Sequence, residues 1–184
     1  IGVIMSTGIG GLGSLLDNVS AVEKGGPRKI SPFMITMMMP NGSSGMIGIE
    51  HGLKGPTFCV VSACASSQDG MGIAWMMLKT GMADAMVVGG SEAIINLIGI
   101  GGFDRIRATS RKSASDLTPS PFDLNRDGLV VGEGAGAIVM ETESHAKARG
   151  ANILAELAGY GATGDAHHIT APTEDGIGGA AAMK

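Results

Sequence analysis

The chain has 184 residues, a formal net charge of −4 at pH 7 and no block of basic residues, which argues against a nucleic-acid-binding surface. Hydrophobic residues make up 44% of it, enough for a buried core, but no apolar run reaches the roughly 18 residues that a membrane span needs. Its two cysteines are not spaced as CxxC and no histidine cluster accompanies them, so neither a disulfide framework nor a metal site is expected and a reducing compartment is the default.

Strand and helix patterns alternate along the chain. In chain order, the patterns predict a strand at 1–5, a helix at 15–22, a helix after 41, a strand at 57–61, a helix at 65–80, a strand within 83–93, a strand within 128–142, a helix at 143–150, a strand region at 152–164 and the start of a helix in 175–184. The longest predicted helix rests on Ile73, Ala74, Met77 and Leu78, which recur at helical spacing. Most of the strands are apolar on both faces, which together with the alternation predicts a layered α/β fold.

Two glycine-containing motifs partly match known ligand-binding patterns, but both are better explained as structural turns. Residues 8–13, GIGGLG, match the dinucleotide pattern after a strand, but no second strand ends on an acidic residue about 20 positions later, so a structural turn is favoured. The segment DLNRDG at 123–128 matches the start of a calcium loop, but its twelfth position is Gly134 and TPSPF before it cannot be a helix. A polar turn held by its own side chains is the better interpretation.

Three of the four histidines lie in local patterns that predict their surroundings. His167 and His168 are adjacent, so in a strand they would point to opposite faces and only one of them would contact a ligand. His145 lies one helical turn after Glu141, which predicts a solvated pair.

Cys64 lies where an apolar strand pattern ends and a helical pattern begins. The free amides and the positive end of a helix dipole favour the nucleophilic thiolate at such a position. The neighbours Ala63, Ala65, Ser66 and Ser67 are small, which leaves room for a substrate, whereas Asp69 in the first turn partly opposes the effect. From these features alone an inert buried cysteine is as well supported as a nucleophile. Cys59, between Phe58 and Val60, is expected to be inert.

Four segments together resemble the β-ketoacyl-acyl-carrier-protein synthases, most closely the elongating condensing enzymes of fatty acid synthesis. They are GLKGPTFCVVSACASS, GMADAMVVGGSEA, PFDLNRDGLVVGEGAGAIVMETESHAKARGA and GYGATGDAHHITAP, with upstream support from STGIGGL and SPFMITMMMPN. The resemblance implies the thiolase-like layered αβαβα fold and a homodimer. On this basis residues 1–150 are assigned to the N-terminal half, which carries the nucleophile, and residues 151–184 to the start of the C-terminal half.

The same resemblance implies roles for individual residues. Cys64 would accept the acyl group from acyl carrier protein, and its backbone N–H would form half of an oxyanion hole. Decarboxylation of a malonyl thioester would then supply the carbanion that attacks this thioester. Thr170 would line the channel for the phosphopantetheine arm, and Arg107 would contact acyl carrier protein. No cofactor and no metal are implied beyond substrates carried on phosphopantetheine.

Two further regions are named by the resemblance. The basic cluster that contains Arg107 also includes Arg105, Arg111 and Lys112, for which a solvated surface loop is as well supported. Residues 37–40 match a region near the dimer contact, where flexible methionines would line an acyl tunnel. The resemblance places the protein in the bacterial cytoplasm or in a plastid or mitochondrial matrix.

The family's HGT, GH and GFGG motifs do not occur in this sequence. We therefore expect the chain to be a piece of a longer protein that is inactive without the histidines. Three other interpretations remain: a polyketide-type ketosynthase or a thiolase, a non-catalytic ketosynthase-like partner subunit, and a dinucleotide-binding module at residues 8–13. The cysteine at position 64 argues against a partner subunit, because such subunits typically replace the nucleophile.

Overall fold

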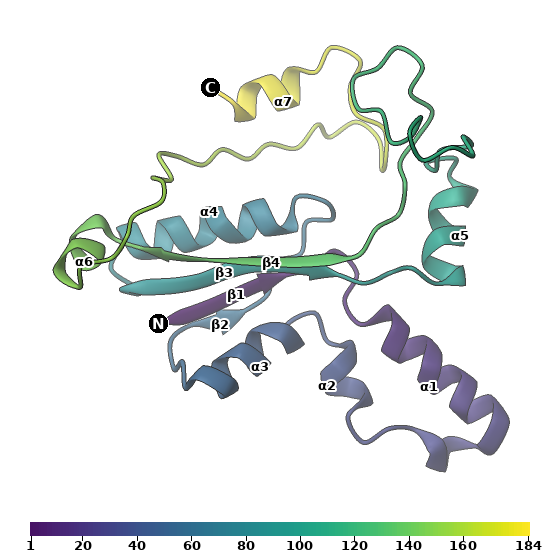
Figure 1. The fold of residues 1–184 in the computed structure, drawn as a ribbon, viewed down its shortest axis with the longest axis horizontal. Helices are drawn as coiled ribbons and strands as arrows, with labels where there is room; N and C mark the ends of the chain where they lie inside the picture. Colours follow the sequence, from purple (N-terminus) through teal and green to yellow (C-terminus); the bar gives the residue numbers. More distant parts are fainter.

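A computed structural model describes residues 1–184 and shows a mixed four-stranded sheet with helices on both faces (Figure 1). The elements are β1 (Gly2–Ser6), α1 (Leu12–Gly25), η1 (Pro27–Lys29), α2 (Met34–Met38), α3 (Gly42–His51), β2 (Thr57–Phe58), α4 (Ser66–Lys79), β3 (Ala85–Glu92), α5 (Leu97–Arg105), β4 (Gly134–Glu141), α6 (Glu143–Ala148) and α7 (Ile177–Ala182). The strand order is β2-β1-β3-β4. Strand β1 is parallel to β2 and β3, and β4 is antiparallel to β3, so the ends of β1 and β3 meet at one edge.

The main core lies between the sheet and α4. It consists of seven buried side chains, all aliphatic or methionine: Ile4, Ala74, Met77, Leu78, Met86, Val88 and Met140. The predicted apolar face of the long helix is confirmed, because Ala74, Met77 and Leu78 of that face are in this core. Helix α3 covers the other face of β1 (Figure 1).

A buried serine continues the short β2 ladder. Strand β2 pairs only with Val3 and Ile4, so the N–H of Met5 has no partner in it. The Ser44 hydroxyl of α3 accepts a hydrogen bond from that N–H at 2.8 Å and donates one to the carbonyl of Phe58 at 2.8 Å. This hydroxyl therefore bridges α3 to the sheet and satisfies a backbone group that burial would otherwise leave unpaired.

Three predictions about strands are corrected. The predicted strand at 57–61 has only two residues, because the chain turns away after Phe58 toward the segment before α4. The buried strand expected within 128–142 is β4, but Gly134 to Val139 are exposed, because β4 is the edge strand of the sheet. The strand expected at 152–164 is absent: this segment crosses the outer side of α4, where no strand edge is available for pairing (Figure 1).

Helix α5 was missed because Gly99, Gly101 and Gly102 lower its helix propensity. The side chain of Asn96 caps it by accepting a hydrogen bond from the N–H of Gly99 at 2.8 Å. The other predicted helices are present, although α1 extends beyond the predicted 15–22 at both ends.

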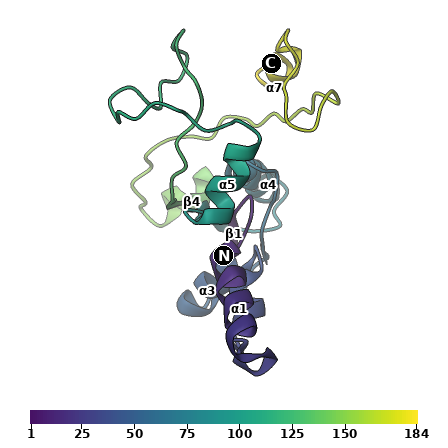
Figure 2. The same cartoon turned by 90° about the vertical axis from the view of Figure 1, so that its right-hand side faces the viewer.

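The segments on either side of β4 extend away from the sheet. Residues 106–133 and 151–176 contain no helix or multi-residue strand and project from the same side of the body (Figure 2). None of the helices combines the length and the hydropathy of a membrane-spanning segment. The predicted boundary at residue 150 falls just after α6 and stays a prediction.

Candidate active site

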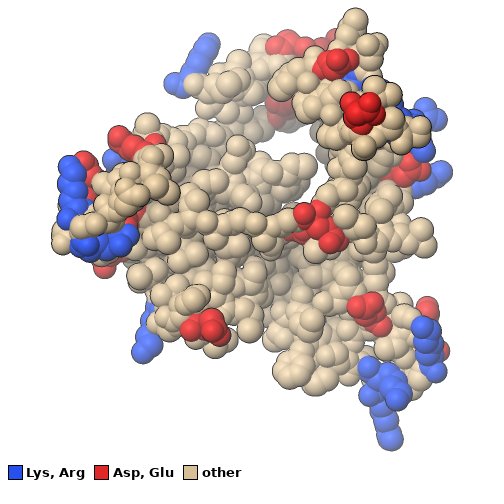
Figure 3. All heavy atoms as spheres, viewed as in Figure 1, with Lys and Arg blue, Asp and Glu red and all other residues tan.

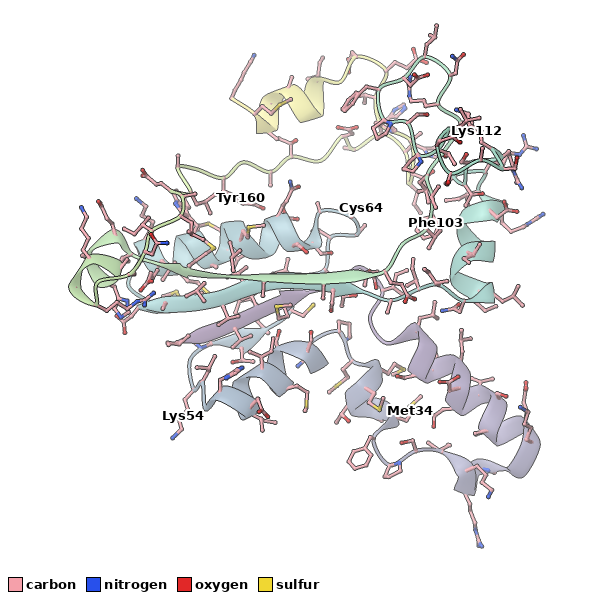
Figure 4. All side chains as sticks on the ribbon, in the orientation of Figure 1. Met34, Lys54, Cys64, Phe103, Lys112 and Tyr160 are labelled. Atoms are coloured by element: carbon pink, nitrogen blue, oxygen red, sulfur yellow. The ribbon has the colours of Figure 1, made fainter.

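Cys64 lies two residues before α4 and has an exposed, free thiol (Figure 4). The tight turn before it includes Ala63 with a φ of 53°, a left-handed conformation that is uncommon for residues other than glycine. The buried Ser66 hydroxyl holds this turn: it accepts from the Ser62 N–H at 2.9 Å and donates to the Ala63 carbonyl at 2.6 Å. The predicted placement of the cysteine at a helix start is confirmed, and the structure excludes the alternative of a buried thiol.

The backbone N–H of Cys64 donates to no group of the chain. It is therefore free to donate to an oxygen atom of a substrate held against the thiol. Cys59 differs from it, because its thiol is half-buried just after β2 and donates to the carbonyl of Val60 at 3.4 Å.

Two cavities meet at Cys64 and Ala63. The larger has a volume of about 880 Å³, and its other wall is formed by residues 163 and 165–172. The smaller, of about 520 Å³, is lined by the ends of β1, β3 and β4 and by Phe103 of α5. Figure 3 shows an open gap between the body of the molecule and the segments that pass over it. A substrate that reaches Cys64 through one cavity can therefore place a second part in the other.

A carboxylate organises the wall of the smaller cavity. Glu92, at the end of β3, accepts hydrogen bonds from the Thr7 hydroxyl at 2.9 Å and from the Gly8 N–H at 2.8 Å. The Thr7 oxygen in turn accepts from the Gly10 N–H at 3.0 Å. Gly10 has a φ of 82°, and a side chain at Gly11 would overlap the carbonyl of Met37. The GIGGLG motif is thus a structural turn packed against α2, as favoured from the sequence.

Thr170 lines the larger cavity together with Cys64, so the two predicted residues lie at one site. The Nδ1 atom of His168 accepts hydrogen bonds from the N–H groups of Thr170 and Ala171, both at 3.1 Å. Asp165 also accepts from the Thr173 N–H at 3.0 Å. The adjacent histidines were expected to point to opposite faces if they lay in a strand, but residues 167–168 are not in a strand, and both line this cavity.

Arg107 lines neither cavity and lies exposed just after α5, with a φ of 59°. Two other members of the predicted basic cluster are engaged: Arg111 pairs with Asp104 at 2.8 Å, and Lys112 lies 3.9 Å from Asp127. Arg105 and Arg107 make no ion pair within the chain. Their charges are therefore the ones available to a partner.

The loop that resembled a calcium site is held by its own and neighbouring polar groups, as predicted. Asp123 accepts from the Asn125 N–H at 2.6 Å, and Asp127 accepts from the Ser110 hydroxyl and the Arg111 N–H, each at 2.7 Å. The Ser110 hydroxyl and then the Arg111 N–H hold the pKa of Asp127 below its ordinary value. No three His, Cys, Asp or Glu side chains are grouped as a metal ion would require.

The sequence reasoning missed Glu92 and Phe103, which line the smaller cavity. The only sequence signal for Glu92 is an acidic residue just after a strand pattern that was expected to end at Gly90, because the neighbouring end of β1 is set by the sheet. No periodicity marks Phe103, whose glycine-rich helix was itself missed. The methionines at 37–39 line neither cavity in this chain.

The family model described as "Beta-ketoacyl synthase, N-terminal domain" matches residues 1–146. The chain is 45% identical over 184 residues to 3-oxoacyl-[acyl-carrier-protein] synthase 2 of Staphylococcus aureus, covering 100% of this chain and 46% of that protein. It is 46% identical over 179 residues to the mitochondrial 3-oxoacyl-[acyl-carrier-protein] synthase of Arabidopsis thaliana, covering 95% of this chain and 39% of that one.

Solved structures of ketosynthases match almost the whole length of this chain. A type II polyketide synthase acyl-carrier protein in complex with its ketosynthase bound to the hexaketide matches with a TM-score of 0.93 and 31% identity, over 98% of this chain and 46% of that one. A β-ketoacyl synthase from Burkholderia phymatum matches with a TM-score of 0.86 and 34% identity, over 98% of this chain and 45% of that one. These matches confirm the predicted α/β ketosynthase fold, and the chain spans a little under half the length of the proteins it matches. This chain belongs to the β-ketoacyl synthase family.

Proposed function

We propose that this chain carries the acyl-accepting centre of a 3-oxoacyl-acyl-carrier-protein synthase that extends acyl chains in fatty acid synthesis. The observation that carries the proposal is the exposed Cys64 thiol at the start of α4, at the point where two cavities meet. A nucleophile at such a junction can receive an acyl group delivered from one side and hold its chain on the other.

The reaction has two steps at this sulfur. The Cys64 thiolate attacks the thioester carbonyl of the acyl carrier, the free Cys64 N–H donates to the developing oxyanion, and the carrier's thiolate leaves. A malonyl thioester then loses carbon dioxide, and the resulting carbanion attacks the Cys64 thioester. The new carbon–carbon bond forms as the carbon–sulfur bond breaks, which regenerates the thiolate.

The larger cavity is proposed to hold the phosphopantetheine arm, because Thr170 offers a hydroxyl and its wall is polar through His167, His168 and Asp165. The smaller cavity is proposed to hold the first part of the acyl chain beside Phe103. Arg107 is proposed to meet the acidic surface of acyl carrier protein, since no acid of the chain neutralises it. No metal or cofactor is proposed to take part.

A homodimer is proposed on the basis of exposed apolar side chains around α2 and α3. Phe33, Ile35, Met37, Met46 and Ile49 are all more than half exposed. A second copy that covered them would place the methionines near an acyl tunnel, as the family resemblance implies. The proposed compartment is that of fatty acid synthesis, either the bacterial cytoplasm or an organelle matrix.

The alternatives have less support. A dinucleotide site at residues 8–13 conflicts with the Gly8 N–H, which already donates to Glu92 and is not available to a pyrophosphate. A non-catalytic partner subunit conflicts with the retained, accessible Cys64. Polyketide chemistry fits the fold, but the two 3-oxoacyl-[acyl-carrier-protein] synthases named above are 45–46% identical to this chain, against 31% for the polyketide structure.

The test is acylation of the natural full-length protein that contains these residues. Incubation with a radiolabelled acyl-carrier thioester should label Cys64, Cys64→Ala should remove the label, and Cys59→Ala should retain it. A label that stays in Cys64→Ala but disappears in Cys59→Ala would refute the proposal.

A further inference from the structure

Tyr160 anchors the segment that passes over α4. It is the single residue from Asn152 to Pro172 that is not exposed. Its ring lies directly against Gly72 of α4, where any side chain would overlap the ring atoms. Its hydroxyl donates a hydrogen bond to a carboxylate oxygen of Asp69, one turn nearer the start of the same helix, at 2.6 Å. Figure 4 shows Tyr160 pointing from this segment toward α4.

The same carboxylate also faces the turn that carries the nucleophile. The buried Ser62 hydroxyl, two residues before Cys64, has no other partner and lies beside Asp69, although outside good hydrogen-bond geometry. The Ser62 hydroxyl, followed by the Tyr160 hydroxyl, holds the pKa of Asp69 below its ordinary value. Asp69 therefore accepts a hydrogen bond from the Tyr160 hydroxyl on one side and faces the Ser62 hydroxyl on the other.

These two contacts reach the two walls of one cavity. Ser62 belongs to the wall that contains Cys64, and Tyr160 comes three residues before Thr163, where the opposite wall begins. Residues 161–163 form no helix or strand, and the Thr163 hydroxyl donates to the Gly178 carbonyl of α7 at 2.6 Å rather than to α4. The distance of this stretch from α4 therefore depends on the tyrosine contact.

We propose that Asp69 and Tyr160 are positioning residues, which hold residues 163–172 at the distance from Cys64 that the phosphopantetheine arm requires. This inference rests on the proposed function and deepens it. The pair does not touch the reacting atoms. It sets the width of the larger cavity, so its loss weakens binding of the arm and leaves the intrinsic reactivity of the thiol unchanged.

The experiment uses the natural full-length protein with Tyr160→Phe, Asp69→Asn and the double variant. Tyr160→Phe keeps the ring on Gly72 and removes only the hydroxyl. Asp17→Asn, an exposed carboxylate on α1 without a hydrogen bond or ion pair, is the matched control. Two rates are measured for each protein: acylation by an acyl-pantetheine thioester, and alkylation of Cys64 by iodoacetamide, which has no arm.

Each single variant is expected to raise KM for the pantetheine thioester about three- to tenfold with kcat within about twofold, the pattern of lost uniform binding. Alkylation by iodoacetamide should be unchanged. KM of the double variant should be no higher than that of the single variant with the higher KM, because the two substitutions remove the same Tyr160–Asp69 hydrogen bond. An unchanged KM in both single variants would overturn the inference. A parallel fall in kcat and in iodoacetamide alkylation would also overturn it, because the pair would then act on the thiol.

A second reagent separates this inference from the proposed function. Iodoacetyl-pantetheine alkylates a thiol without any acyl transfer, and its rate relative to iodoacetamide reports the arm-binding cavity alone. If the wild-type protein takes no acyl label but prefers the pantetheine reagent, and Tyr160→Phe loses that preference, the proposed function fails and the positioning role stands. If wild-type and variant show the same preference, the positioning role fails.

Discussion

The carboxylate of Glu92 accepts a hydrogen bond from the backbone N–H of Gly8 at 2.8 Å, and this contact joins the ends of β3 and β1. Both residues line the smaller cavity beside Cys64. The contact thus connects the sheet edge to the site, and the glycine at position 8 lets the backbone approach the carboxylate closely.

Removing this carboxylate should destabilise the protein. Glu92→Ala leaves the Gly8 N–H and the Thr7 hydroxyl without their acceptor, and we expect a loss of about 1–3 kcal/mol in the free energy of unfolding. Urea denaturation measures it, with the exposed Glu23→Ala as the control. A change no larger than that of the control would mean that water replaces the carboxylate at no cost.

A methyl group at Gly72 should displace the segment that passes over α4. In Gly72→Ala the new carbon overlaps the ring of Tyr160, and we expect a net loss of stability of about 1–3 kcal/mol from overpacking. A methyl group at Gly101 of α5 would meet no atom within 4 Å other than its own helix backbone, so Gly101→Ala should gain up to about 1 kcal/mol instead. Thermal unfolding of both variants checks the opposite signs; equal shifts would contradict the packing of Tyr160.

Stability should fall in acid through Glu141. The Arg149 guanidinium, and then His145, lower the pKa of Glu141 from 4.5 to about 2. Because the pKa of Glu141 is lower in the folded state, its ionised carboxylate stabilises that state fully above pH 4.5. This stabilisation is lost as the pH falls toward about 2. Urea unfolding followed across that interval should show the loss.

Glu141→Gln should flatten the pH dependence of stability in that interval. Glu143→Gln should change it less, because the exposed pair of Glu143 with Lys147 is screened by water. An unaltered pH profile in Glu141→Gln would show that the ion pair with Arg149 does not form in solution.

Reversal of charge at Arg107 should affect only substrates delivered by a protein carrier. In Arg107→Glu we expect KM for an acyl-carrier-protein thioester to rise about tenfold or more, and KM for a free pantetheine thioester to stay constant. Lys54→Glu, on the opposite side of the sheet from Cys64, is the control (Figure 4). If the two substrates are affected equally, Arg107 does not contact the carrier.

The helix α4 could be predicted because its apolar residues recur at helical spacing, which reflects one buried face. The strands β1 and β3 could be predicted because each is a short continuous apolar run, as expected for strands buried on both faces. The position of Cys64 followed from the same patterns, since it lies where an apolar run ends and a helical spacing begins. The segment 152–164 has an equally apolar pattern, but no strand edge lies beside it. It therefore crosses α4 without regular secondary structure, and Tyr160 holds it there.

The amino-acid sequence by itself determined the α/β class, the helix that follows Cys64 and the kinship with condensing enzymes, because these depend on residues close together in the chain. Only the tertiary structure decided that Thr170 and both adjacent histidines share a cavity with Cys64, and that Glu92 and Asp69 bridge distant segments. The reason is that such contacts join residues more than 80 positions apart, and no local period records which segments will meet.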